Sequence, residues 1–161
     1  MTTTEHPGIA RFRDEHARLG GVGEIVILPD SVHTAALAAE ALGCEVGAIA
    51  NSLVFDADGS PVLILTSGAH RVDTAKVAAS LGVSALRRAK PDFVREHTGQ
   101  VIGGVSPIAH PTPVPTYLDP WLRRYDVVWA AAGHPAAVFA TSNDELVALT
   151  GATEIHVSDG E

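Results

Sequence analysis

A short loop with two glycines and a proline is the part of the sequence best suited to chemistry. Gly103 and Gly104 are followed by Val105, Ser106 and Pro107. Glycine allows a backbone to approach a ligand closely with positive φ angles, and proline makes the end of the loop rigid. Successive peptide N–H groups could therefore point into a pocket and stabilise an oxyanion. An ordinary tight connection would show the same pattern.

Other residue types that perform catalysis lack the spacing that their chemistry requires. The eight histidines show no HxH, HxxxH or HExxH spacing, and Cys44 is the single cysteine, so we expect no metal site. Ser106 precedes Pro107 outside any G-x-S-x-G pattern, which argues against a serine nucleophile. Neither G-x-G-x-x-G nor the P-loop pattern is present, which removes the simplest dinucleotide and phosphate sites.

Basic residues gather at two places in a chain that is acidic overall. The formal net charge is -8, which argues against broad electrostatic capture of nucleic acid but permits a specific contact with one end of an RNA. The two clusters could meet RNA phosphates, or they could be solvated surface charges. The first contains Arg87, Arg88 and Lys90, and the second contains Arg123 and Arg124.

The elements that must position these residues can be read from periodicity and capping signals. Asp30 or Ser31 can cap the second helix, and glycines follow most of the expected helix ends. Asp58-Gly59 is a strong hairpin signal between two apolar runs. The expected helices cover residues 7–20, 31–42, 73–81, 91–98, 119–124 and 142–150. The expected strands cover residues 24–28, 46–55, 62–66, 127–132, 136–140 and 153–157, with short strands before residues 73 and 91.

Residues 101–120 contain too much glycine and proline for regular structure over most of their length. A loop of this length inside a compact domain is usually functional or disordered, and the apolar segments that flank it favour function. Hairpins interspersed with irregularly placed helices predict an α+β or mixed α/β fold. We expect a largely antiparallel sheet or barrel.

Length and composition limit the class of protein. The chain has 161 residues, of which 46% are apolar and 19% are charged, so we expect one domain over 1–161 that can bury a core. The longest apolar runs fall far short of the roughly 18 residues of a membrane span. The N-terminus lacks the apolar region of an export signal, and a lone cysteine suits a reducing compartment. We therefore expect a cytoplasmic protein without membrane contact.

Five segments in a fixed order carry a more specific signal than the loop alone. They are T-A-A-L-A-A-E-A-L-G at 34–43, N-S-L-V-F at 51–55, R-V-D-T-A-K-V-A-A-S-L-G at 71–82, T-G-Q-V-I-G-G-V-S-P at 98–107 and P-T-Y-L-D at 115–119. With them the chain resembles the YbaK/ProX family of aminoacyl-tRNA editing domains, which includes free-standing deacylases and the editing insertion of bacterial prolyl-tRNA synthetases. The resemblance implies a mixed, mostly antiparallel, barrel-like sheet surrounded by helices.

The resemblance also implies an activity, which is hydrolysis of the ester between a wrong amino acid and the 3′-terminal adenosine of a tRNA. It implies no metal or other cofactor. The loop from Gly103 to Pro107 would present backbone groups to the aminoacyl carbonyl, and substrate groups would largely position the attacking water. Asn51 is a further catalytic candidate, and His134 could face the same pocket from a strand turn. The candidates for substrate binding are Ser52, Thr116, Gly133 and His134.

Asn51 departs from the family pattern, in which a lysine precedes the S/T-L segment. Asparagine keeps a donor and an acceptor but lacks the charge that would meet a phosphate or carbonyl. Losing one charge-assisted contact costs about 1.5–3 kcal/mol, or roughly 10- to 150-fold. Three possibilities follow: a deacylase for another substrate, a deacylase whose cation comes from elsewhere, or a binding protein that does not hydrolyse. Hydrolysis of another small ester or amide is a weaker option.

We therefore expect a trans-editing deacylase that admits a small amino acid. Its partner would be the aminoacylated 3′ end of a tRNA, and an aminoacyl-tRNA synthetase is a further candidate partner. The chain would act as a monomer or a homodimer.

Overall fold

The long hairpin predicted from Asp58-Gly59 forms the centre of the fold. The computed structural model describes residues 6–29 and 34–158, and in it β2 (Ile49–Ala57) and β3 (Ser60–Ser67) pair along almost their whole length. Asp58 and Gly59 have φ angles of 53° and 94°, as a type I′ turn requires. The predicted hairpin is confirmed.

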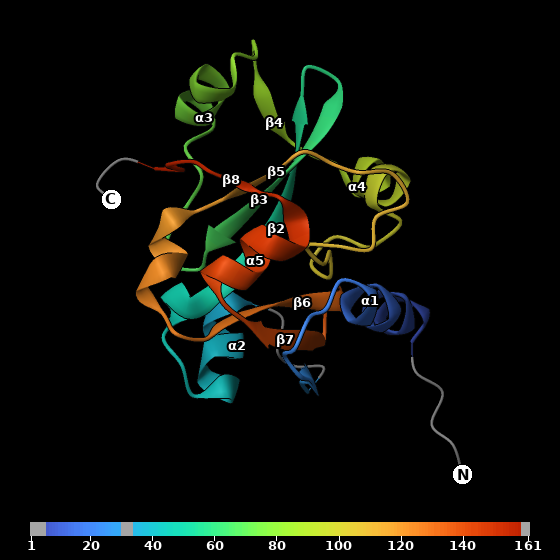
Figure 1. Ribbon diagram of the computed structural model, residues 1–161. Helices are drawn as coiled ribbons and strands as arrows, with labels where there is room; N and C mark the ends of the chain where they lie inside the picture. The colour runs from blue at the N-terminus through green and yellow to red at the C-terminus, as the bar shows by residue number, and fades with distance from the viewer. Residues whose placement is uncertain (1–5, 30–33, 159–161) are drawn as a thin grey trace.

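The eight strands of the described chain form one mixed sheet in which most pairs are antiparallel. The order is β1-β7-β6-β2-β3-β5-β8, and β4 pairs with β2 beside this path. Strands β6 and β7 run across the direction of β2 and β3 (Figure 1), so the sheet is strongly curled. The strands not yet located are β1 (Ile25–Ile27), β4 (Leu86–Arg88), β5 (Thr116–Leu118), β6 (Val128–His134), β7 (Ala137–Thr141) and β8 (Thr153–Glu154).

Most helices begin and end at the residue types that the sequence indicated. Asp73 and Ser142 accept backbone N–H bonds as N-caps, and Gly82 and Gly151 follow the helix ends in the left-handed conformation. The α-helices are α1 (Pro7–Arg18), α2 (Ala35–Leu42), α3 (Thr74–Leu81), α4 (Pro91–Thr98) and α5 (Asn143–Thr150), and the 3-10 helices are η1 (Val46–Ala48) and η2 (Pro120–Arg124). No described helix is long and apolar enough to cross a membrane.

Three expected boundaries are wrong because hydrogen bonds fix the backbone differently, one of them local and two between segments far apart in the sequence. The cap of α2 is Thr34, whose hydroxyl accepts from the N–H of Leu37 at 3.1 Å, whereas Asp30 and Ser31 lie outside the described residues. Residues 46–48 form η1 instead of extending β2, and the carbonyl of Gly47 accepts from the Ser67 hydroxyl at 2.7 Å. The last strand ends at Glu154. Beyond it, the Val157 carbonyl accepts a hydrogen bond from the N–H of Asp73, the N-cap residue of α3.

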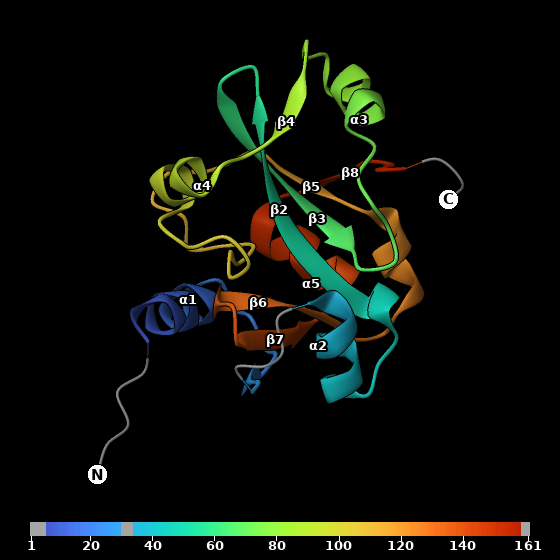
Figure 2. The same ribbon diagram turned by 180° about the vertical axis from the view of Figure 1, so that it is seen from behind.

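Helices cover both faces of the sheet, and alternate side chains along β2 pack against different helices. Ala50 and Val54 belong to the largest core cluster, to which α1, α4 and α5 contribute, whereas Leu53 and Phe55 pack with the cluster under α3. Helix α5 lies in front of β2 and β3 in Figure 1 and behind them in Figure 2. The two faces of β2 therefore meet different layers, and a site at its edge has access to both.

Candidate functional site

Strand β2 has one edge that is only partly used. The other edge pairs with β3 from Ala50 to Ala57, but this one pairs with β6 only at Ile49 and Ala50 and with β4 only from Phe55 to Ala57. Residues 51–53 between these pairings have no partner strand on this side, so the sheet forks here. A gap between strands of one sheet is a natural place for a ligand, as at the switch points of open α/β sheets.

The peptide groups of Ser52 point into this fork. Leu63 and Leu65 of β3 bond through their backbone toward β5 at 2.9 Å each, so the peptide groups of the intervening Ile64 face β2. Ile64 pairs with Leu53, and the alternation of an antiparallel ladder then turns the N–H and C=O of Ser52 to the open edge. The hydroxyl of Ser52 is also buried and bonds to no described residue. Ser52 therefore offers a substrate the two polar groups of its backbone.

A cavity of about 900 Å³ opens at the fork. Its walls come from α2, β2, the segment before α3, the end of β4, α4, the loop before Pro107, and β6 and β7. Figure 2 shows how these elements are arranged around β2. Lining residues with polar or aromatic groups include Asn51, Ser52, His70, Arg71, Thr74, Arg88 and Trp129. The cavity thus joins segments that lie far apart in the sequence.

The structure brings four of the candidate site residues to this cavity: Asn51, Ser52, Gly103 and Val105. Gly103 has a φ angle of 88° and open space where a Cβ would lie. Gly104 instead packs against Pro135, so closely that a Cβ would lie 2.6 Å from its ring. The two positions therefore require glycine for different reasons: Gly103 because its φ angle is positive, and Gly104 because its backbone lies too close to Pro135 for a side chain.

The N–H groups of the loop divide into used and available ones. The N–H of Gly104 donates to the Val101 carbonyl at 3.0 Å, and that of Ser106 donates to Gln100 Oε1 at 2.8 Å. Those of Gly103 and Val105 donate to no described residue, and both residues line the cavity. Two donors therefore remain for a ligand oxygen.

Gln100 holds the loop from behind. Its Oε1 accepts from the N–H and the hydroxyl of Ser106 at 2.8 and 3.1 Å, and its Nε2 donates to the carbonyls of Ile108 and Ala109 at 3.3 and 3.4 Å. Gln100 is only 6% exposed, and both ends of its amide are used. The single hydroxyl proton of Ser106, which is fully buried, is shared between Gln100 Oε1 and the Ile108 carbonyl, whose oxygen lies 2.5 Å from the hydroxyl. Ser106 thus positions the loop and lies away from the cavity.

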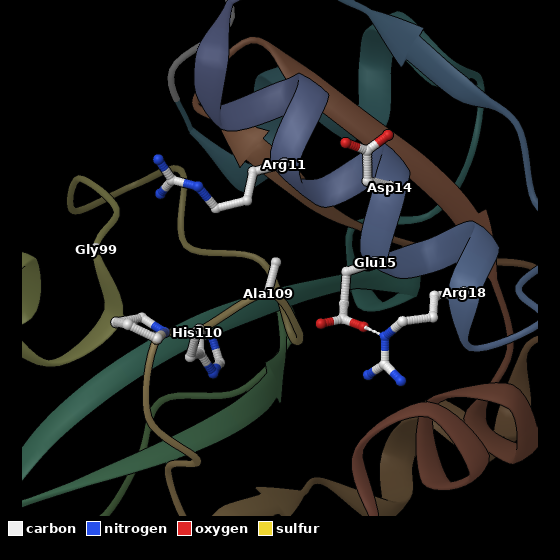
Figure 3. Close-up of a pocket in the computed structure, with 8 residues that line it drawn as sticks. Arg11, Asp14, Glu15, Arg18, Gly99, Ala109 and His110 are labelled. Atoms are coloured by element: carbon white, nitrogen blue, oxygen red, sulfur yellow. Dashed lines mark hydrogen bonds and ion pairs between the residues drawn. The ribbon is translucent and has the colours of Figure 1, made fainter.

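His110 binds the same serine from a second cavity of about 570 Å³ on the other side of the loop. Its Nε2 donates to the Ser106 carbonyl at 2.8 Å, because a carbonyl can only accept. Burial lowers the pKa of His110, and this hydrogen bond opposes the shift. Figure 3 shows Arg11, Asp14, Glu15 and Arg18 of α1 around this cavity, with Glu15 and Arg18 ion-paired. It is a mixed-charge space behind the loop.

The remaining candidates lie outside the lining of the large cavity. Pro107 is buried at the end of the loop. Gly133 packs against α1, where a Cβ would meet the carbonyl of Gly8. His134 Nδ1 accepts from the N–H of Ala136 at 3.0 Å, and the ring contacts His6. Thr116, on β5, donates to the Val114 carbonyl at 2.9 Å.

Sequence reasoning missed Gln100 and Arg71 as site residues, although both lie in the quoted segments.

The second basic cluster, Arg123 and Arg124, forms contacts away from the cavity. Arg123 pairs with Glu154 at 2.6 Å, and Arg124 lies over the Trp121 ring at 3.4 Å. No group of three metal-ligating side chains occurs in the part of the chain that the structure describes.

The chain belongs to the aminoacyl-tRNA editing domain family, which it matches over residues 29–149. A solved structure described as a candidate trans-editing enzyme for prolyl tRNA synthetase is 44% identical, with a TM-score of 0.91, and covers 98% of this chain and 100% of that one. The uncharacterised protein YwhH of Bacillus subtilis is 38% identical over 112 residues, 68% of this chain and 69% of YwhH.

A third relative carries a more specific name. EbsC of Enterococcus faecalis, named as a candidate Cys-tRNA(Pro)/Cys-tRNA(Cys) deacylase, is 28% identical over 121 residues, which cover 70% of this chain and 74% of EbsC. The fold is thus that of the YbaK/ProX type, as the sequence segments indicated.

Proposed function

We propose that the chain hydrolyses the ester of a mischarged aminoacyl-tRNA in trans. Family membership supports the class of reaction. The observation that carries the proposal is the pair of N–H groups on Gly103 and Val105, which are left without a described acceptor beside Asn51 and Ser52 in one cavity. An ester carbonyl bound to these donors would gain stabilisation as its oxygen becomes negative.

The reaction needs little beyond these donors and correct positioning. Water adds to the ester carbonyl carbon, the bond to the ribose oxygen breaks, and that oxygen takes up a proton, which releases the amino acid and the tRNA. The side chain of Asn51 and the free backbone groups of Ser52 can hold the aminoacyl end beside the loop. Ser106 does not act as a nucleophile in this scheme, because its hydroxyl is committed to Gln100 and Ile108.

We propose a small amino acid as the part that is removed, as the family resemblance implies. An apolar part of the cavity supports an uncharged side chain on this amino acid, because it offers no charged partner to a long polar one. Its residues are Leu28, Ile49, Trp129 and Val138. We further propose that the chain acts in the cytoplasm, where a synthetase such as prolyl-tRNA synthetase supplies the mischarged tRNA.

The test is a panel of tRNAs charged with the wrong amino acid and incubated with the purified protein. We expect at least one small aminoacyl ester to disappear much faster than in buffer. Equal rates with and without protein across the panel would contradict the proposal.

A binding module without turnover is the second candidate, and Asn51 is the observation that favours it. The same experiment with protein in excess over aminoacyl-tRNA separates the two functions. A deacylase shortens the life of the ester, whereas a pure binding module shields the ester and lengthens its life.

A further inference from the structure

The lining of the large cavity is cationic in a protein that is acidic overall. The formal net charge of the chain is -8. The described residues that line the cavity nevertheless include Arg71 and Arg88 and not one Asp or Glu. Such a distribution favours an anionic ligand at this place, since charges of one sign in a cleft concentrate the field there.

Arg88 lies on the same face of the sheet as Asn51. It pairs directly with Phe55 across β2 and β4, and side chains of directly opposed residues share a face. Residues 51, 53 and 55 alternate onto that face. Asn51 and Phe55 are four positions apart along β2, which is roughly 13 Å at about 3.3 Å per residue. Arg88 thus flanks the cavity, four positions along β2 from Asn51.

Arg71 reaches the same face from the opposite side. It follows β3, which pairs with the other edge of β2, and the next residue, Val72, packs against the cluster that contains Phe55. In Figure 2 the segment that leads to α3 lies on one side of β2, and the end of β4 lies on the other. A ligand that extends out of the cavity along this face would pass between the two guanidinium groups.

Both guanidinium groups are available. Arg71 and Arg88 are exposed, and neither forms an ion pair or hydrogen bond with a residue that the structure describes. Arginine binds phosphate in a planar, bidentate geometry and remains charged at all relevant pH values. Phosphodiester groups are therefore the anions that this pair fits best.

We propose that Arg71 and Arg88 bind the phosphodiester groups that precede the terminal adenosine of an RNA 3′ end. The two arginines supply the positive charge that Asn51 lacks, but they act on the RNA backbone and not on the reacting ester. This inference rests on the proposed function for the identity of the ligand. The residues that carry it are separate from the oxyanion donors.

The direct test is binding of an uncharged RNA hairpin with a single-stranded CCA 3′ end, followed by fluorescence anisotropy. Arg71→Gln and Arg88→Gln should each raise Kd about tenfold, and each should lower the slope of log K against log salt by about 0.7. Arg87→Gln is the matched control, since it removes the same charge one residue away. Arg87 pairs with Asp56 and so points to the opposite face. We expect it to change Kd less than twofold.

Three results would overturn the inference. One is an equal loss of affinity in Arg87→Gln and Arg88→Gln, which would indicate general charge attraction. Another is unchanged binding of a hairpin without its CCA end. The third is an unchanged Kd in both Arg71→Gln and Arg88→Gln.

A kinetic comparison separates this inference from the proposed function. The Arg71→Gln and Arg88→Gln substitutions should raise KM more for aminoacyl-tRNA than for an aminoacyl-adenosine without phosphates. If the wild-type protein hydrolyses neither ester but binds the CCA end through Arg71 and Arg88, the proposed hydrolysis fails and the phosphate site stands. If hydrolysis occurs and KM is unaffected for both substrates, the phosphate site fails alone.

Discussion

Two walls of the cavity differ in how firmly their polar groups are held: the loop from Gly103 to Pro107, called here the loop wall, and residues 51–53 of β2, called the strand wall. The loop wall is held in place because Gln100 and His110 both bind Ser106, which leaves the N–H groups of Gly103 and Val105 available. The strand wall presents Asn51, whose side chain bonds to no described residue. Preorganised backbone donors suit stabilisation of developing charge, since they need no reorganisation during the reaction. Unrestrained side chains suit the binding of a flexible ligand.

The largest expected effect comes from removing the support of the loop. Gln100→Leu leaves the N–H of Ser106 buried without a partner, and each such group costs about 1–3 kcal/mol. We expect the free energy of unfolding to fall by about 2–4 kcal/mol over the whole network. We also expect kcat to fall about 100-fold, because a small misplacement of the donors has that effect. Urea unfolding and single-turnover deacylation measure the two quantities.

Gln100→Glu provides the matched control for this substitution. It keeps the acceptor for Ser106 but loses the donor to Ile108 and Ala109. Because the buried carboxyl group would face the Ile108 and Ala109 carbonyls, its unfolding free energy should fall at least as far as that of Gln100→Leu, whereas its kcat should fall less because an acceptor for Ser106 remains. A Gln100→Leu protein with full activity would show that the loop needs no support.

A smaller effect is expected from changing the conformation of the loop itself. Gly103 and Gly20 have similar φ angles, 88° and 82°, and both have open space at the Cβ position. Alanine should cost each site about 1–2 kcal/mol, from strain alone. Only Gly103→Ala should also lower kcat, by about tenfold or more, since it displaces an oxyanion donor. Equal kcat in Gly103→Ala and Gly20→Ala would contradict the role of the loop.

On the strand wall, Asn51→Lys should separate activity from stability. The side chain of Asn51 forms no hydrogen bond with a described residue, so the melting temperature should change little. A new charge-assisted contact to the substrate should raise kcat/KM by about tenfold. A stability loss as large as that of Gln100→Leu would remove the distinction between the two walls.

The smallest effect concerns pH and His110. Burial lowers the pKa of this side chain in the folded state, so the unfolded chain takes up a proton first as the pH falls. Stability should be fully present above about pH 6.5, the ordinary pKa of histidine, and should be lost progressively below it. His110→Gln, which can still donate to Ser106, should show a weaker dependence of melting temperature on pH between 8 and 5. Parallel curves for the two proteins would contradict this assignment.

The sequence predicts the fold better than it predicts the site. The hairpin and the ends of α3, α4 and α5 follow from local signals, Asp58-Gly59 for the turn and Asp73 or Gly99 at helix ends. The gap in pairing beside residues 51–53 depends on strands that lie far apart in the sequence. No local pattern indicates it.

The glycine and proline loop could be identified from the sequence, but which of its N–H groups are already hydrogen-bonded could not. Which N–H groups are used depends partly on Gln100, whose side chain reaches forward in the sequence to both Ser106 and Ala109. Likewise, Arg88 was one of several basic residues in the sequence. Only its register opposite Phe55 places it at the cavity and Arg87 away from it.

The central claim is that Gly103 and Val105 donate to the ester carbonyl. Its most direct test is an NMR titration with an aminoacyl-adenosine analogue in which an amide replaces the ester, following the backbone N–H signals of residues 103–106. The signals of Gly103 and Val105 should move downfield, while those of Gly104 and Ser106, already bonded inside the loop, should move little. Saturation of the protein with the analogue and no movement of the Gly103 and Val105 signals would contradict the claim.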